Sequence, residues 1–438
     1  MSHRLCRPLS ASFCLGLAVC LGLVVTLAAA QELPTAAPEQ VGMSSPRLER
    51  LDAFLQQAIQ DHRLSGAVTV VARRGKVVYF KPLGMADREA SRPMRKDTIF
   101  RIASMTKPVT SVAVMMLYEE GRLLLNDPIS KYIPEFNNPK VLVADPPAGA
   151  GSRATVPAKA PITVRHLLTH TSGLTYQWNE RLGPLYQEAG ITHGLLQDDG
   201  TLAEKMKRLA SLPLLNHPGE KYEYGLSIDV LGYLVEVVSG RTLDAFFGER
   251  IFQPLGMKDT CFFPPREKLE RLAAVYERTK AGDLQRMSDE PVVQGSFVYR
   301  ADYPYHGLRR YYSGGGGLCS TASDYLRFCQ MLLNGGELDG ARLLSRKTVE
   351  LMTTNQIGEL TIGGGQKFGL GFSVLAHPGG SNLNWSPGSY GWGGFWNTTF
   401  LIDPKEELIT ICMTQLRPGH DLPVSERVPI LAAQAIGD

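Results

Sequence analysis

The sequence lacks the features that mark several common functional classes. Its 438 residues carry a formal net charge of only +3, so no surplus of one sign indicates nucleic acid or an acidic surface as partner. None of its seven cysteines forms a Cys-x-x-Cys pair, the pattern of zinc ribbons and thioredoxin-type redox sites. No Gly-Lys-Ser/Thr follows the glycine run 314–317, and no Gly-x-Ser-x-Gly elbow occurs. Neither a phosphate loop nor an ordinary α/β-hydrolase is therefore predicted.

Only one stretch is long and apolar enough to concern a membrane, and it lies at the N-terminus. Residues 1–30 combine two arginines and no acidic residue with an apolar run from Phe13 to Leu27 and a small-residue site at 28–30. This pattern predicts a secretory signal peptide cleaved near Ala30, and hence an exported protein, periplasmic or secreted, with no stable membrane span after cleavage. An uncleaved anchor is the alternative, disfavoured because the run is short for a span.

Four cysteines lie beyond this predicted signal: Cys261, Cys319, Cys329 and Cys412. An exported protein can oxidise such residues to disulfides. Four cysteines allow three connectivities, and the sequence does not choose among them.

What remains is ordinary globular composition, 44% hydrophobic and 20% charged, enough for one large domain or two coupled ones. Helices are predicted over 46–60, 202–215 and 226–240, and strands over 66–72, 76–80, 368–375, 392–402 and 407–414. Helices thus cluster in the middle and strands at both ends. The predicted architecture is an α/β (α+β) domain formed by 31–120 and 290–438, with a mainly helical region inserted at 121–289.

The stretch 101–121 predicts a helix buried in the middle of the molecule, closed by Gly121. Ser104 and Lys107 stand at its start, three residues apart and so on one helical face. A serine hydroxyl becomes a nucleophile when a base takes its proton, and a buried lysine can be that base because desolvation disfavours the ammonium form. The helix N-terminus also favours a developing oxyanion. Ser-x-x-Lys alone occurs about once or twice by chance in a chain this long, so a buried helix with a polar first turn stays open.

His166 and His170 stand four residues apart within 162–174, on a predicted helix. Zinc ligands can have this spacing, but no His-Glu-x-x-His pattern and no third ligand is evident. The favoured interpretation is that the residues from His170 to Ser172 form hydrogen bonds at the helix end and the turn at Gly173. No metal and no cofactor is predicted.

Four ordered motifs between about residue 40 and the C-terminus resemble the serine β-lactamase and penicillin-binding-protein superfamily, and within it the class C β-lactamase-like (family VIII) carboxylesterases. They are Ser104-Met-Thr-Lys107, Leu167-Leu-Thr-His-Thr-Ser-Gly-Leu174, Pro218-Gly219 followed by Tyr224, and Trp392-Gly393-Gly394. The Ser-x-x-Lys element is a known signature of this superfamily. The resemblance implies a β-lactamase/transpeptidase-like fold, with an antiparallel sheet flanked by helices.

The resemblance also implies the site residues. Ser104 is the expected acylated nucleophile, Lys107 and Tyr224 the base system, and the backbone amides of Ser104 and Phe395 the oxyanion hole. Trp392, Gly393 and Gly394 are the expected substrate-binding strand. Taken alone, Tyr224 also suits a core tyrosine that follows a turn.

Two departures from the resemblance narrow the expected substrate. Trp392 stands where β-lactamases and peptidases have a lysine that pairs with a substrate carboxylate, a contact worth about 1.5–3 kcal/mol. Leu226 stands where they have an asparagine.

The aromatic residues of 297–312 are candidates for a pocket wall, with a packed surface loop as the alternative; they are Phe297, Tyr299, Tyr303, Tyr305, Tyr311 and Tyr312.

The sequence therefore predicts an exported serine hydrolase that cleaves uncharged, short-chain carboxylic esters through an acyl-Ser104 intermediate. Three alternatives remain: a β-lactamase or D-amino-acid peptidase, an acyltransferase, and a sensor that is acylated and stalls. The expected partner is a small-molecule ester, with no nucleic acid, and the oligomeric state is not predicted.

Overall fold

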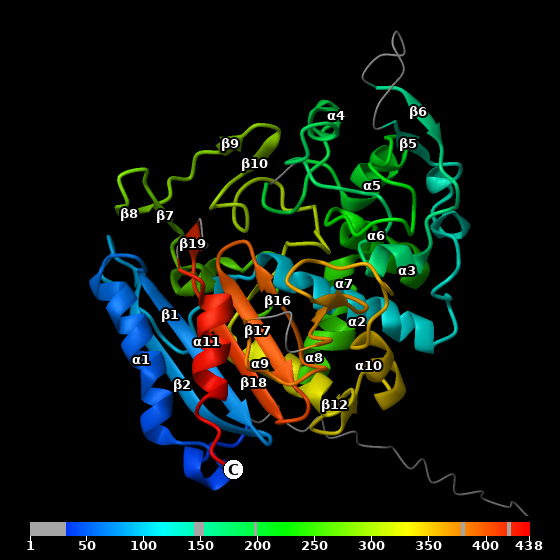
Figure 1. Ribbon diagram of the computed structural model, residues 1–438. Helices are drawn as coiled ribbons and strands as arrows, with labels where there is room; N and C mark the ends of the chain where they lie inside the picture. The colour runs from blue at the N-terminus through cyan, green and yellow to red at the C-terminus, as the bar shows by residue number, and fades with distance from the viewer. Residues whose placement is uncertain (1–31, 144–152, 197–198, 378–381, 418–421) are drawn as a thin grey trace, which may run out of the picture.

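The computed structural model describes residues 32–143, 153–196, 199–377, 382–417 and 422–438. The predicted signal peptide, 1–30, lies outside these residues. One eight-stranded sheet dominates, with strand order β14-β15-β16-β17-β18-β1-β2-β3 and antiparallel pairing throughout. Its strands are β1 Gly66–Arg73, β2 Lys76–Asp87, β3 Arg92–Pro93, β14 Lys367–Phe368, β15 Ser373–Val374, β16 Tyr390–Gly394, β17 Thr398–Asp403 and β18 Leu408–Met413. Strands from both ends of the chain thus lie side by side, blue beside orange in Figure 1.

Strand β1 is buried along its whole length because helices cover both faces of the sheet. Val68 and Val70 face the cluster that holds α2 (Thr106–Glu119) and α9 (Ala322–Leu333). Ala67 and Val71 face α1 (Ser45–Gln60) and α11 (Val424–Ala433). Burial on both faces explains why the strand reads as an unbroken apolar run rather than an alternating one.

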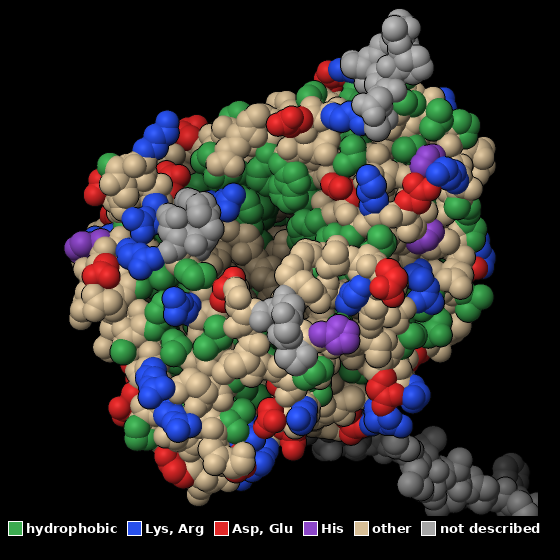
Figure 2. Space-filling model, viewed as in Figure 1, with side chains coloured by type: hydrophobic (Ala, Val, Ile, Leu, Met, Phe, Trp, Pro, Cys, Tyr) green, Lys and Arg blue, Asp and Glu red, His purple; other side chains and the backbone are tan. Residues whose placement is uncertain are grey.

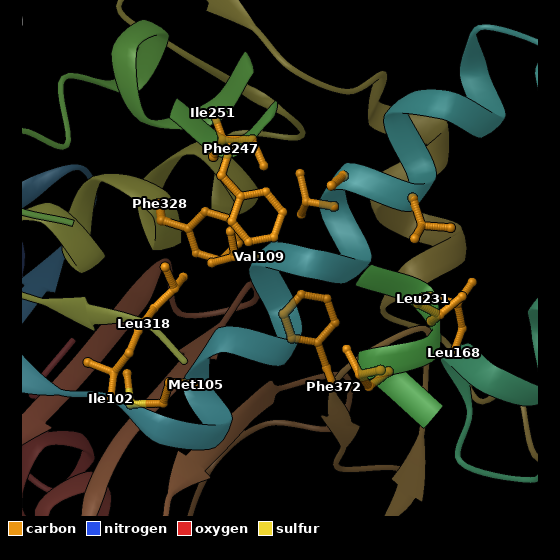
Figure 3. Close-up of a cluster of buried hydrophobic side chains, with 14 of the residues drawn as sticks. Ile102, Met105, Val109, Leu168, Leu231, Phe247, Ile251, Leu318, Phe328 and Phe372 are labelled. Carbon is orange, nitrogen blue, oxygen red and sulfur yellow. The ribbon is translucent and has the colours of Figure 1, made fainter. Parts of the chain in front are cut away.

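Helix α2 is the predicted central helix. Its residues from Thr106 to Leu117 are all buried, and Gly121 closes it with a left-handed φ of 70°. Figure 3 shows Val109 of this helix in one cluster with side chains from other elements, among them Leu168, Leu231, Phe328 and Phe372. Helix α6 (Ser227–Ser239) packs directly on α2, α3 and α5. This contact connects the middle of the chain to the sheet domain, and the division at 120 and 290 stays a prediction.

The remaining helices and strands are short, and most of them are formed by the middle part of the sequence (Figure 1). The helices are α3 Val164–Leu168, α4 Gly183–Glu188, α5 Leu202–Ala210, α7 Leu243–Phe247, α8 Gln253–Leu255 and α10 Arg346–Met352. The strands are β4 Phe100–Arg101, β5 Lys140–Leu142, β6 Thr155–Pro157, β7 Tyr276–Arg278, β8 Leu284–Arg286, β9 Val292–Gln294, β10 Phe297–Tyr299, β11 Cys319–Ser320, β12 Glu337–Leu338, β13 Ala341–Arg342 and β19 Leu416–Arg417. Among the described helices, none is both long and apolar enough to cross a membrane.

Two predicted strands were wrong in the same way, because each is a hairpin. The stretch 392–402 turns at Asn397, whose φ is 62°, and so divides into β16 and β17. The stretch 368–375 turns at Gly371, with φ of 97°, between β14 and β15. An apolar run with no Pro or charge at the turn conceals such a reversal. The helix predicted over 202–215 also ends earlier, at Ala210.

The helix predicted over 46–60 and the strands predicted over 66–72, 76–80 and 407–414 were predicted correctly. Strands β1 and β2 form a hairpin, and β17 joins β18 through the turn after Asp403. All four cysteines beyond the predicted signal are free.

Candidate active site

Ser104 lies where the backbone enters the central helix. Strand β4 leads into a short 3-10 turn, Ala103–Met105, and α2 begins at Thr106. Ala103, immediately before the serine, has a left-handed φ of 41°, which costs energy for any residue with a Cβ. Ser104 is only half-buried although its neighbours are buried. The turn therefore presents the Ser104 hydroxyl at the start of the buried helix α2.

Three side chains converge at this point. Lys107 Nζ lies 3.1 Å from Ser104 Oγ, and the Tyr224 hydroxyl donates to Ser104 Oγ over 2.8 Å. The ammonium of Lys107 also lies 4.7 Å from the centre of the Tyr224 ring. The structure thus brings together the serine, the lysine and the tyrosine that the sequence singled out, within the reach that proton transfer requires.

Lys107 is almost fully buried, at 1% exposure. Besides Ser104, it donates to the Tyr176 hydroxyl over 3.0 Å and to the Gly315 carbonyl over 2.6 Å. Burial above all holds the pKa of Tyr176 well above its usual range, so this phenol keeps its proton. Sequence reasoning missed both partners: Tyr176 follows the Leu174 motif by two residues, and the glycine run was considered only as a phosphate loop.

Tyr224 is held by aromatic contacts. The Trp392 indole N–H donates to the Tyr224 hydroxyl over 3.4 Å, and the His170 ring lies 4.7 Å from the Tyr224 ring. His170 is fully buried, and burial lowers its pKa well below the usual value, so the imidazole is neutral. Trp178 also belongs to this cluster, with its ring nearly parallel to that of Tyr224 at 6.2 Å.

The two histidines do not share a helix as predicted. Helix α3 ends at Leu168, and His170 has a left-handed φ of 55°. His170 Nδ1 accepts from the backbone N–H of Gly225, while His166 Nδ1 accepts from Thr163 N–H at the helix start. Among the described residues, no group of three or more His, Cys, Asp or Glu is placed to hold a metal.

The C-terminal end of β16 passes close to the turn that carries Ser104. A Cβ on Gly394 would lie 2.4 Å from the Ile102 carbonyl oxygen and 2.2 Å from Thr398 Oγ1. Only glycine therefore allows this approach. Phe395 follows directly and, with Ser104, lines the same cavity. The oxyanion hole expected from their two backbone amides stays a prediction.

A cavity of about 380 Å³ opens above Ser104. Its wall is mostly aromatic or aliphatic, and Figure 2 shows hydrophobic side chains gathered around the hollow. The wall includes Tyr176, Trp178, His193, Leu195, Phe297, Trp392 and Phe395. None of the described residues that line it carries a charged side chain at neutral pH, because burial lowers the pKa of His193 to about 4.

The aromatic stretch 297–312 contributes to this wall through one residue. Phe297 lines the cavity and stacks on His193 at 4.3 Å. Tyr303 and Tyr311 are buried in the core and do not line it. Of the two alternatives, a pocket wall therefore holds for Phe297 alone, and most of the stretch is packed away from the cavity.

Fold and site together define a serine hydrolase with a Ser-x-x-Lys centre on a β-lactamase/transpeptidase-like fold. The chain belongs to the β-lactamase family, whose model, Beta-lactamase, matches residues 51–435. This confirms the fold and the family that the motifs predicted.

Three characterised or solved proteins show the range of this family. Esterase EstB of Burkholderia gladioli is 37% identical over 373 residues, which is 83% of this chain and 89% of EstB. Monacolin J acid methylbutanoyltransferase of Aspergillus terreus is 30% identical over 405 residues, 85% of this chain and 91% of the relative. The solved structure of EstCE1, a hydrolase with promiscuous acyltransferase activity, is 29% identical with a TM-score of 0.75, covering 90% of this chain and 99% of EstCE1.

Proposed function

We propose that this protein is a carboxylesterase that cleaves uncharged esters with short acyl groups through an acyl-Ser104 intermediate. The observation that carries the proposal is the convergence of Lys107 and Tyr224 on Ser104 Oγ beneath a cavity without charged lining side chains. The similarity to esterase EstB supports the same reaction class.

The proposed reaction begins with acylation of Ser104. Its Oγ bonds to the ester carbonyl carbon while its proton passes to the unprotonated amine of Lys107. The electron pair of the carbonyl moves to its oxygen, which the amides of Ser104 and Phe395 stabilise. The C–O bond to the alcohol then breaks, Tyr224 gives its hydroxyl proton to the departing oxygen, and Lys107 returns a proton to Tyr224. Water repeats the sequence on the acyl-enzyme and releases the carboxylic acid and free Ser104.

Trp392 and Leu226 support the choice of an uncharged substrate. Trp392 forms part of the cavity wall and presents an indole where the related β-lactamases present a lysine. Leu226 is fully buried at the start of α6, so no amide side chain projects from this position. A substrate carboxylate would lose its hydration here, and none of the described lining residues offers a cation to replace it, which is costly.

Hydrolysis of p-nitrophenyl butyrate and of a chromogenic cephalosporin by the wild type and by Ser104→Ala tests the proposal. We expect ester turnover in the wild type, poor cephalosporin turnover, and loss of ester turnover by a factor of about 10³ or more in the variant. Ser425→Ala is the matched control, since Ser425 also lines the cavity but makes no described contact with Lys107 or Tyr224. Fast cephalosporin turnover would instead assign a β-lactamase, and a burst without turnover a stalled sensor.

Acyl transfer is the second candidate, favoured by the similarity to the methylbutanoyltransferase and to EstCE1, a hydrolase with promiscuous acyltransferase activity. Here an alcohol rather than water resolves the acyl-enzyme. Adding methanol to the p-nitrophenyl butyrate reaction and measuring methyl butyrate against butyrate gives the partition directly.

We also propose export, which rests on the sequence of residues 1–30 alone. A basic start, an apolar run and a small-residue site are together typical of a cleaved secretory signal. Sequencing the N-terminus of the mature protein tests it: a start near residue 31 supports export, and an intact Met1 contradicts it.

A further inference from the structure

Asp229 is a buried carboxylate that the proposed reaction does not use. It lies in the first turn of α6, five residues after Tyr224, with no exposed surface. Its Oδ1 accepts from Ser313 Oγ over 2.6 Å, from Gly315 N–H over 3.3 Å and from the Tyr311 hydroxyl over 3.3 Å. Its Oδ2 has no hydrogen-bond partner among the described residues. Burying an ionised carboxylate this deeply costs free energy of folding, so we expect Asp229 to have a function.

The backbone of Gly315 connects this carboxylate to the lysine. Gly315 N–H donates to Asp229, and the carbonyl of the same residue accepts from Lys107 Nζ over 2.6 Å, the shortest of the lysine's contacts. A Cβ on Gly315 would lie 2.3 Å from Asp229 Oδ2. Glycine is therefore required for the carboxylate and the backbone to come this close.

The hydrogen-bonding geometry of the Lys107 amine explains why the Gly315 carbonyl matters for its role as a base. A neutral lysine amine has two N–H groups and one lone pair, and it acts as a base only if the lone pair points at the proton to be removed. The Gly315 carbonyl and the Tyr176 hydroxyl are the two acceptors that can take the N–H groups. With both in place, the lone pair is left to face Ser104 Oγ, 3.1 Å away.

We propose that Asp229 is a positioning residue for the base: it fixes Gly315, whose carbonyl orients the Lys107 amine toward Ser104. The inference rests on the proposed function of Ser104 and Lys107. Tyr224 and Asp229 lie on one short segment, so the proton relay and the group that orients the base are placed together. No acidic residue is among the described residues that line the cavity, and Asp229 itself lies behind that lining.

The charge of Asp229 gives a second consequence. Burial raises the pKa of Asp229, while the hydrogen bond from Ser313 and the charge of Lys107 lower it. The groups that face it are Ser313, Tyr311, Gly315, Tyr176 and Lys107, of which Lys107 is the only cation. Because this attraction is mutual, removing the charge of Asp229 also removes an attraction that acts on Lys107.

The test compares Asp229→Asn with the wild type on p-nitrophenyl acetate. Asparagine removes the charge and so weakens the hydrogen bonds from Ser313 and Gly315, which a carboxylate accepts more strongly than a neutral amide does. We expect kcat to fall about 10- to 100-fold, as misplacement of a reacting group does, with KM within about threefold. A structural role alone would lower the melting temperature and leave kcat of the folded enzyme unchanged.

Two further variants keep the test decisive. Asp324→Asn is the matched control, because Asp324 is also a buried aspartate but binds Thr260 and the backbone of Asp259 instead. Ser313→Ala keeps the carboxylate of Asp229 but removes its shortest hydrogen bond. We expect kcat of this variant to fall several-fold. It decides the test if Asp229→Asn does not fold. An Asp229→Asn enzyme, or failing that a Ser313→Ala enzyme, with kcat within twofold of the wild type would overturn the proposal. Failure of the proposed function itself shows separately, as a wild type that does not turn over the ester.

Discussion

Trp392 shows how one side chain sets the chemistry of the site. Its indole lines the cavity and donates to Tyr224, but it offers no charge to a substrate carboxylate. We expect Trp392→Lys to lower KM for a carboxylated ester about tenfold, because a charge-assisted contact to a carboxylate is worth about 1.5–3 kcal/mol. KM for the uncharged ester should rise or stay constant. Steady-state kinetics on a matched pair, a methyl-capped and a free-acid p-nitrophenyl succinate, measure both.

Trp392→Phe separates the new charge from the lost indole. It removes the N–H that contacts Tyr224 but adds no cation. If both variants change the two KM values alike, the missing lysine does not explain the preference for uncharged substrates.

The close passage of β16 over the turn before Ser104 is the contact between elements on which the proposed oxyanion hole depends. Gly394 allows it, since a Cβ there would lie 2.4 Å from the Ile102 carbonyl oxygen. We expect Gly394→Ala to move the strand away and lower kcat about 100-fold, the usual cost of one oxyanion donor, with little change in KM. Stopped-flow acylation rates on p-nitrophenyl butyrate give the measurement.

The neighbouring glycine serves as the comparison. A Cβ on Gly393 has one close neighbour, the Thr398 carbonyl oxygen at 3.2 Å, so Gly393→Ala should cost far less. Equal rates for Gly394→Ala and the wild type would mean that this approach does not shape the oxyanion hole.

At the scale of the whole molecule, contacts between the two ends of the chain hold the fold together. Arg73 makes several of these contacts. Its buried guanidinium donates to the carbonyls of Val41 and Gly42 and to the side chains of Glu406 and Asp438. We expect Arg73→Met to lower the free energy of unfolding by about 2–3 kcal/mol, because carbonyls and carboxylates lose charged donors. Activity at 25 °C should persist, since none of these contacts touches the site. Thermal unfolding followed by circular dichroism checks this.

Arg74→Met is the control, because Arg74 is 45% exposed and its pair with Asp438 is screened by water. Its melting temperature should stay within about 1 °C of the wild type. If the two variants melt alike, the ends of the chain are held by the strands alone.

The sequence by itself determined the family, the central helix and one half of the site. Ser104 and Lys107 meet because a helix places residues three apart on one face, which is a local rule. The apolar character of α2 and β1 likewise follows from burial on all sides, which leaves its mark in composition. The four motifs together gave the order in which these elements occur.

Only the tertiary structure decided what surrounds the lysine. Tyr176 and Gly315 lie 69 and 208 residues from it in the chain, and Asp229 reaches it only through Gly315. No local pattern encodes such contacts, because they arise where α6, the glycine run and α2 pack against one another. The hairpins at Asn397 and Gly371 escaped prediction for a related reason: pairing with neighbouring strands, not side-chain periodicity, determines where those chains turn.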